Sequence, residues 1–402
     1  MKSSEFGENF LFLAHHINKH NKGYVDFYIG PKKISKIVDN EAITSPSKLL
    51  TDCKALQKDL FKQGYDKKRE RYLEKLLMAM RTSIEVINGI KISTKEQFLK
   101  LYDVALQPVK ESELDNLKEE FNAAYGGLGS LEKRMNDLRV RRTVPEGKVF
   151  ELFKKALNIT RERTKELFVD LLPENEHINI ELVKNNNSNE AKWACYNWYM
   201  GNFRSRIEVN PNYNMYWTAL LPAAAHEGYP GHHSEFVVKE QKLYRELNQF
   251  EHSILLLNSP KLIICEGIAD LAVNVLFSYR DQAEISLREF CIDSSKESSI
   301  EALITQSKVK GKMSLFWYNF AYHALIDGWS EEKLIRYGTN FEIYSQVNIK
   351  NRIKLLFNPV YSTTTFSYNM GSKLIINKYG EFPLVKDFRD LLINPILPSD
   401  LI

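Results

Sequence analysis

The sequence predicts a mostly helical protein with one small antiparallel β-sheet beside the helix that carries its candidate site. Three observations support this fold class. Apolar residues recur at helical spacing over most of the first 170 residues and again after residue 253. Between residues 175 and 215 the pattern changes to the alternation that is typical of strands. The chain has 402 residues, of which 44% are hydrophobic and 26% charged, so it is long enough to bury a large core.

The first part of the chain is predicted to consist of helices joined by short turns. Ser45 followed by Pro46 is a favourable helix start, because serine caps the first turn and proline fits its first position. Turns are expected near Pro108, at the glycine pair 126–127 and before Pro145. The helices expected from apolar spacing span residues 45–62, 67–88, 95–106, 111–124, 129–139 and 145–157.

The segment 175–215 is interpreted as a small antiparallel hairpin. An alternating run begins at His177, a polar loop follows, and residues 193–210 are rich in aromatic and β-branched side chains. A helix begins near Leu220, directly after this sheet. Because the exposed edge of a sheet can pair with an extended peptide, we take residues 199–203 as a candidate edge, with Gly201 and Asn202 as substrate-binding candidates.

Helices are expected again after residue 253, over 262–279, 298–326 and 331–341, with a closing helix near Phe388. The longest apolar tract, 253–277, is interrupted by Lys261, Glu266 and Asp270. A membrane span here would bury three charges at about 3 kcal/mol each. We therefore expect a buried helix that carries functional charges.

Charge and cysteine content narrow the possible classes of protein. The chain has 55 basic and 51 acidic side chains and a net charge of +4, so we expect neither a nucleic-acid nor a membrane partner. The N-terminal apolar run follows acidic residues and lacks a small-residue cleavage site, which predicts no signal peptide and a cytoplasmic location. Reduced thiols fit that location, because the four cysteines form no Cys-x-x-Cys pair: Cys53, Cys195, Cys265 and Cys291.

The stretch 226–233, His-Glu-Gly-Tyr-Pro-Gly-His-His, has the composition of a metal site. A His-Glu pair followed by a histidine one turn later is typical of zinc metallopeptidases, in which the imidazoles bind the metal and the glutamate is the general base. The spacing differs here, because Pro230 stands where the second histidine would be. The identity of the second ligand therefore has to be argued from geometry.

Two histidines compete for that position. On an unbroken helix His233 would lie about 20° from His226, whereas His232 would lie about 120° away. Pro230 makes an unbroken helix unfavourable, and the glycines on either side of it tolerate unusual dihedrals. If residues 228–231 loop two positions out of register, His232 takes the place of the usual second histidine. We predict His232 as the ligand and His233 as its supporting neighbour.

Glu266 is the candidate third ligand, since it stands in an otherwise apolar helix where an unpaired carboxylate would be costly. Two histidines and one carboxylate leave a fourth zinc position open for water. Asp270 lies on the same helix face and could accept the free imidazole N–H of a ligand histidine. Glu227 diverges from His226 by about 100°, so its expected role is to take a proton from the metal-bound water and pass it to the leaving amine.

The two segments together resemble the bacterial domain-of-unknown-function family 885, relatives of the gluzincin metallopeptidases. In that family His-Glu-x-x-Pro-Gly-His-His is followed by Glu-Gly-Trp-Ala; here the segments are 226–233 and 266–269, with Ile268 in place of tryptophan. Residues 365–371 and the closing segment after Phe388 match more loosely. The resemblance implies a helical gluzincin-like fold and gives weight to Tyr368, whose hydroxyl could stabilise an oxyanion, although a core tyrosine is the alternative.

Arg352 and His323 are further candidates for binding a substrate carboxylate or the oxyanion. Taken together, the sequence predicts an N-terminal helical region, residues 1–170, and a metal-binding catalytic region, residues 171–402, in one continuous fold around a cleft. The predicted activity is that of a zinc-dependent peptidase or amidase acting on a short peptide. Two alternatives stay open: the same ligands could hold iron for oxygen chemistry, or the chain could be a helical binding protein without activity.

Overall fold

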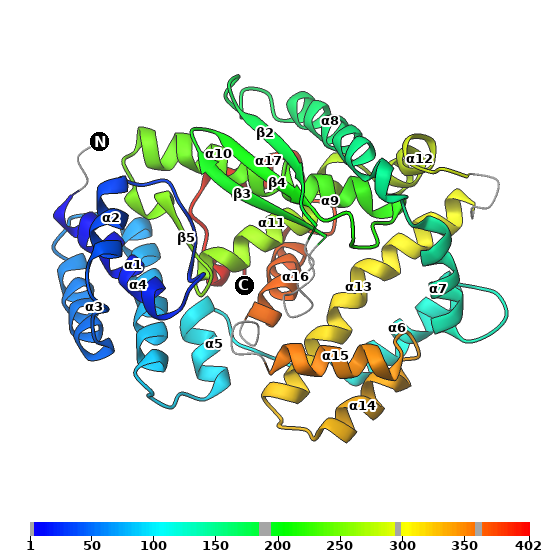
Figure 1. The fold of residues 1–402 in the computed structure, drawn as a ribbon, viewed down its shortest axis with the longest axis horizontal. Coiled ribbons are helices and arrows are strands. Elements are labelled where there is room, and N and C mark those ends of the chain that lie inside the picture. Colours follow the sequence, from blue (N-terminus) through cyan, green and yellow to red (C-terminus); the bar gives the residue numbers. More distant parts are fainter. Residues whose placement is uncertain (1–3, 185–193, 294–298, 358–363) are drawn as a thin grey trace.

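The computed structural model of the protein describes residues 4–184, 194–293, 299–357 and 364–402, and most of these residues are helical (Figure 1). The sheets are small, one of two strands and one of three. The mostly helical fold class predicted from the sequence is confirmed. Short 3-10 turns lie at Glu146–Lys148, Trp217–Ala219, Phe250–Ser253, Thr364–Phe366 and Pro398–Asp400.

The N-terminal elements form a group on one side of the molecule (Figure 1). Ser4, Ser45 and Asp66 each cap a helix here, because their side chains accept hydrogen bonds from first-turn backbone N–H groups. A separate apolar core lies among these elements, and the later residues Phe250 and Ile254 join it. The elements are α1 (Glu5–His20), β1 (Val25–Tyr28), α2 (Lys32–Asn40), α3 (Pro46–Leu60) and α4 (Lys67–Ile87).

The next helices follow the sequence prediction closely, with one difference in length. The helix expected over 145–157 begins at Val149 and runs to Leu167. Thr160 and Thr164 are buried on the same face, so the buried stripe continues through hydroxyl side chains that apolar spacing does not reveal. The helices are α5 (Thr94–Tyr102), α6 (Glu111–Ala124), α7 (Leu131–Arg142) and α8 (Val149–Leu167).

The three-stranded sheet is mixed and not purely antiparallel, which corrects the sequence expectation. Its strands are β2 (His177–Leu182), β3 (Cys195–Gly201) and β4 (Arg204–Val209), in the order β2-β4-β3. The hairpin β3–β4 is antiparallel as expected. Strand β2 pairs with the second strand of that hairpin and not with the first, and therefore runs parallel to β4. The sheet packs against α8, α9 (Leu220–Glu227) and α10 (His232–Lys239).

The central helices connect the sheet to the rest of the fold. After α10, a π-helical segment spans Glu240–Glu246, and β5 (Ile254–Leu256) then pairs antiparallel with β1. The buried helix expected in the apolar tract is α11 (Pro260–Leu276), and α12 (Tyr279–Glu289) follows it. In the described part of the chain no single helix is long and apolar enough to cross a membrane; α11 and α12 reach that length only as a pair bent by 81°.

The C-terminal helices complete the main core, which takes residues such as Phe153 and Phe316 from both sides of residue 170. Helix α16 crosses α11 where two glycines meet: a Cβ on Gly371 would lie 2.0 Å from the carbonyl oxygen of Ile263, and one on Gly267 would lie 2.5 Å from Gly371. The two helices therefore touch backbone to backbone. The C-terminal helices are α13 (Ile300–Leu325), α14 (Glu331–Asn340), α15 (Gln346–Leu356), α16 (Ser367–Tyr379) and α17 (Val385–Ile393).

Candidate metal centre

The motif 226–233 contains a complete break between two helices. Helix α9 ends at Glu227 and α10 begins at His232. The sequence predicts a bulge within one helix, whereas the structure has two separate helices. Gly231 makes this possible, since a Cβ there would lie 2.1 Å from the carbonyl oxygen of His226. The break brings His232, the first residue of α10, next to His226 in the last turn of α9, with ring centroids 4.8 Å apart.

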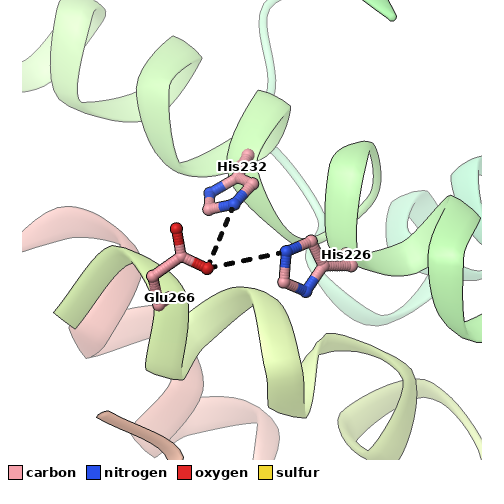
Figure 2. A group of neighbouring side chains, drawn as sticks. All are labelled: His226, His232 and Glu266. Atoms are coloured by element: carbon pink, nitrogen blue, oxygen red, sulfur yellow. Dashed lines mark ion pairs between the residues drawn. The ribbon is translucent and has the colours of Figure 1, made fainter. Parts of the chain in front are cut away.

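Glu266 of α11 faces both of these histidines (Figure 2). Its Oε2 atom lies 3.7 Å from Nε2 of His226 and 3.9 Å from Nε2 of His232. One ligand atom from each of the three residues lies within 4.8 Å of the others. The structure thus brings together the three residues that the sequence analysis selected as metal ligands.

The geometry and the donor set fit a divalent metal ion. Oε2 of Glu266 is buried and has no hydrogen-bond partner among the described residues, although two imidazoles face it. Two histidines and one carboxylate form a typical catalytic zinc set, and bonds of about 2.0–2.1 Å would place the ligand atoms about 3.4 Å apart. The observed separations are slightly wider, and small side-chain rotations would close the difference. An ion would satisfy this carboxylate oxygen, for which the described residues provide no hydrogen bond.

Asp270 orients the ring of His226. Its Oδ1 atom lies 3.3 Å from Nδ1 of His226, which leaves Nε2 facing Glu266. Burial favours the neutral ring, but the hydrogen bond to Asp270 and the charges of Glu227 and Glu266 outweigh it and raise the pKa of His226 to about 10. This is the position that the sequence analysis assigned to Asp270.

His232 is held differently. Its ring stacks on Phe236, at 5.6 Å between centroids and 10° between planes, and its buried Nδ1 has no hydrogen-bond partner among the described residues. Burial, together with the charge of His226, lowers the pKa of His232 well below its ordinary value. A neutral imidazole is the form that binds a metal.

Several carboxylates lie around the cluster. Burial raises the pKa of Glu266 against the opposing charge of His226, and together with the nearby carboxylates of Asp270, Glu227 and Asp26 it brings this pKa to about 8. Carboxylates gathered at this density in a buried site disfavour one another's charged forms. A divalent cation would relieve that repulsion.

Glu227 lies beside the cluster without being one of its three ligands. Its backbone carbonyl oxygen accepts a hydrogen bond from Asn197 Nδ2 at 2.5 Å. Strand β3 therefore holds the end of α9. Burial raises the pKa of Glu227 above its ordinary value, which suits a group that must accept and release a proton near neutral pH.

His233 points away from the cluster into a buried network. Its Nδ1 lies 2.8 Å from Oγ of Ser205, and its Nε2 lies 3.0 Å from Oε2 of Glu176. Glu176 also accepts hydrogen bonds from Tyr229 and from Arg161, whose Nε lies 2.8 Å away. Burial opposes the charge of Glu176, but these donors lower the pKa of its carboxyl to about 2. The network ties α8 and the sheet to the break between the two ligand histidines.

Two acidic residues near the site were not found from the sequence. Asp26 in β1 accepts a hydrogen bond from the hydroxyl of Tyr196 and acts electrostatically on Glu227 and Glu266. Glu176 precedes β2 and anchors His233. Neither belongs to a local motif, because each reaches the site through tertiary packing, and no sequence signal distinguishes them from surface carboxylates.

The predicted edge residues lie in a turn and not against the cluster. Gly201 ends β3, and Asn202 follows with a positive φ of 54°. The backbone N–H of Asn202 donates to Glu240 at 3.1 Å, and its Oδ1 accepts from Arg245 at 2.7 Å. Strand β3 is an edge strand of its sheet, as expected, but the part of it that contacts the end of α9 is Asn197.

The remaining predicted substrate-binding residues have other partners. His323 stacks on Trp329 at 3.7 Å and makes hydrogen bonds to Asp327 and Glu111, whereas Arg352 lies 5.1 Å above the ring of Trp317. None of their described contacts is with the cluster. Tyr368 belongs to α16, and its side chain lies outside the described part of the structure.

A cleft of about 810 Å³ adjoins the cluster and includes Asp270 in its lining. Helices α9, α11, α12, α13 and α16 contribute the walls. A second cavity of about 870 Å³ lies between α1 and α3, but it shares no residue with the cluster or its carboxylates. Of these two cavities, only the first shares a residue, Asp270, with the surroundings of the cluster, and none of the three candidate ligands lines it.

The fold and the site define a helical protein with a candidate metal centre between three helices. No family model matches the chain, and no curated protein sequence matches it either. One solved structure, of a "putative lipoprotein" from Colwellia psychrerythraea, is similar with a TM-score of 0.55 and 12% identity, over 92% of this chain and 68% of that one. Another, of a "putative lipoprotein of unknown function" from Shewanella oneidensis, has a TM-score of 0.47 and 12% identity, over 90% and 76%. The first similarity shows a shared fold and nothing about activity.

Proposed function

We propose that the protein is a zinc-dependent hydrolase, a peptidase or amidase that cleaves a short peptide or a peptide-like amide. One observation carries the proposal. His226, His232 and Glu266 converge from three helices, and the buried Oε2 atom of Glu266, which faces both imidazoles, has no hydrogen-bond partner among the described residues. A set of three protein ligands with an open fourth position is typical of catalytic zinc and not of structural zinc.

Each residue around the cluster would have its own role in amide hydrolysis. Zinc bound by the three ligands would supply a Lewis acid and a water activated for attack. Glu227 would take the proton from such a water and later give a proton to the leaving amine, so its carboxyl would return to its starting state. Asp270 keeps Nε2 of His226 directed at Glu266. Asn197 holds the backbone of Glu227 through the hydrogen bond from its Nδ2 to the Glu227 carbonyl oxygen.

Metal analysis and two substitutions test the proposal. Purified protein is expected to bind about one equivalent of zinc, to lose it in Glu266→Ala, and to hydrolyse at least some members of a library of short peptides in a zinc-dependent way. Glu227→Gln should keep the metal and lose hydrolysis. Retained turnover in Glu227→Gln, together with iron content and oxygen dependence, would replace hydrolysis by oxygen chemistry. Full zinc occupancy without turnover of any peptide would favour a binding protein.

Two further proposals concern relationship and location. We keep membership of the domain-of-unknown-function family 885 as a proposal, supported by segments 226–233 and 266–269. We also keep the cytoplasm as the proposed location. The solved structure from Colwellia psychrerythraea that shares the fold is described as that of a putative lipoprotein. Fractionation of cells that express the full-length gene tests the location directly.

A further inference from the structure

The cleft beside Asp270 has the size and composition of a ligand site. Its volume of about 810 Å³ falls within the ~300–1,000 Å³ range of small-molecule sites. Pro222, one turn before His226 in α9, and Asp270 belong to its wall on the side of the cluster. Much of the remaining wall is apolar, including Trp217, Leu271, Val273, Leu303, Leu315 and Ile376. Such a surface suits the apolar side chains of a peptide.

Helix α13 adds a cation to this apolar wall. Lys310 lines the cleft and is accessible from it, and within the described residues its ammonium group makes no hydrogen bond or ion pair. Lys312, two residues further along, also lines the cleft, but its Nζ is paired with Glu120 at 2.7 Å. Lys310 is thus a positive charge that faces the cleft without a compensating carboxylate.

Other cations lie near Lys310. The guanidinium group of Arg142 lies 5.5 Å above the ring of Trp217, a lining residue. The surrounding protein, together with the charges of Arg139 and Arg142, lowers the pKa of Lys310. Like charges are brought together here at an energetic cost, and an anionic ligand would remove that cost.

Two of the three carboxylates that line the cleft have other partners. Asp270 faces His226, and Glu381 accepts a hydrogen bond from the hydroxyl of Tyr279. Glu113 lies in the first turn of α6, where the helix dipole stabilises a negative charge. None of the three acts on Lys310 as a neighbouring charge. The cleft therefore has both a carboxylate that belongs to the surroundings of the cluster, Asp270, and on α13 a cation without a described partner, Lys310.

We infer that this cleft binds substrates that carry a carboxylate, which pairs with Lys310 while an apolar segment of the substrate lies against the apolar lining. The inference rests on the proposed hydrolase function and names its substrate class: short peptides, or peptide-like amides, with a carboxylate beyond an apolar residue. The carboxylate can be the C-terminus of the peptide or the side chain of an acidic residue.

Binding of three small peptides tests the inference without relying on turnover. The probes are acetyl-leucyl-phenylalanine with a free carboxylate, its C-terminal amide, and acetyl-leucyl-glutamate amide, whose only carboxylate is in the side chain. Each is titrated calorimetrically into the full-length Glu227→Gln protein, alone and combined with Lys310→Gln. Lys58→Gln is the matched control, since it removes the same charge from exposed α3, which packs against α1 and α4.

The free acid is expected to bind about tenfold more tightly than its amide, as one charge-assisted contact allows. Lys310→Gln should abolish that ratio, whereas Lys58→Gln should preserve it. Tight binding of the glutamate probe would assign the site to acidic side chains; weak binding would assign it to the C-terminus. Equal affinity for acid and amide, an unchanged ratio in a folded Lys310→Gln protein, or no binding of any probe would overturn the inference. If the ratio is found but wild-type protein hydrolyses nothing, the binding site stands and the hydrolase proposal fails.

Discussion

Oδ1 of Asp270 lies 3.3 Å from Nδ1 of His226, so the ring presents its other nitrogen to Glu266. Partners of this kind fix the orientation of a metal-binding imidazole. Asp270→Ala is therefore expected to weaken zinc binding about 10- to 100-fold, measured by competition with a chelator. The chain supplies a control, because Asp327 also contacts Nδ1 of a histidine, His323, away from the cluster. If Asp327→Ala weakens zinc binding as much as Asp270→Ala does, the orienting role is wrong.

The two neighbouring histidines should respond differently to removal. His232→Ala is expected to lose zinc while it keeps most of its stability, because its Nδ1 has no described partner to lose. His233→Ala leaves the buried Glu176 without one donor, so it should lower the free energy of unfolding by about 1–3 kcal/mol and still bind one zinc. Metal content by mass spectrometry and urea denaturation measure the two effects. Zinc lost in His233→Ala but retained in His232→Ala would reverse the assignment.

Glu227→Gln should separate metal binding from catalysis. The amide keeps the size of the side chain but cannot accept the proton, so the rate constant is expected to fall about 10²- to 10⁴-fold at unchanged zinc content. Glu174→Gln, an exposed carboxylate, provides a control for charge alone. Turnover within a fewfold of wild type would rule out Glu227 as the general base.

The network around Glu176 predicts a pH dependence of stability. Its pKa is about 2 in the folded protein, below the ordinary 4.5, so its contribution is present above pH 4.5 and is lost as the pH falls toward 2. A difference of this size corresponds to roughly 3 kcal/mol. Glu176→Gln should therefore be less stable than wild type at pH 6, and the gap should narrow steadily between pH 4.5 and 2. Chemical denaturation across that range measures it, and a gap that is constant with pH would contradict the assignment.

Gly231 predicts a steric effect on the metal site. A Cβ at this position would lie 2.1 Å from the carbonyl oxygen of His226 and 2.4 Å from that of Ala225, so Gly231→Ala must displace the backbone between the two ligand histidines. Loss of both zinc affinity and thermal stability is expected. Gly147→Ala is the control, since no heavy atom lies within 4 Å of its Cβ. Normal zinc binding in Gly231→Ala would show that the backbone between α9 and α10 can follow another path without disturbing the site.

The helices and the three candidate ligands could be predicted because their signals are local. Apolar spacing predicted helices such as α6, and the run 226–233 indicated a candidate metal site within a few residues. Pairing partners could not be predicted in the same way: the alternation after His177 indicates a strand but does not say that it pairs parallel to β4. Asp26 and Glu176 were missed for a related reason, since only packing between distant segments brings them to the site.

The glycine contact between α11 and α16 limits how the cleft can open. Because Gly267 and Gly371 pack main chain against main chain, neither helix can slide past the other without a collision. Glu266, adjacent to Gly267, therefore moves as a rigid body with Lys373 and the other α16 residues that line the cleft. A shift of α11 would carry the α16 wall of the cleft with it, so the position of Glu266 and the shape of the cleft are coupled.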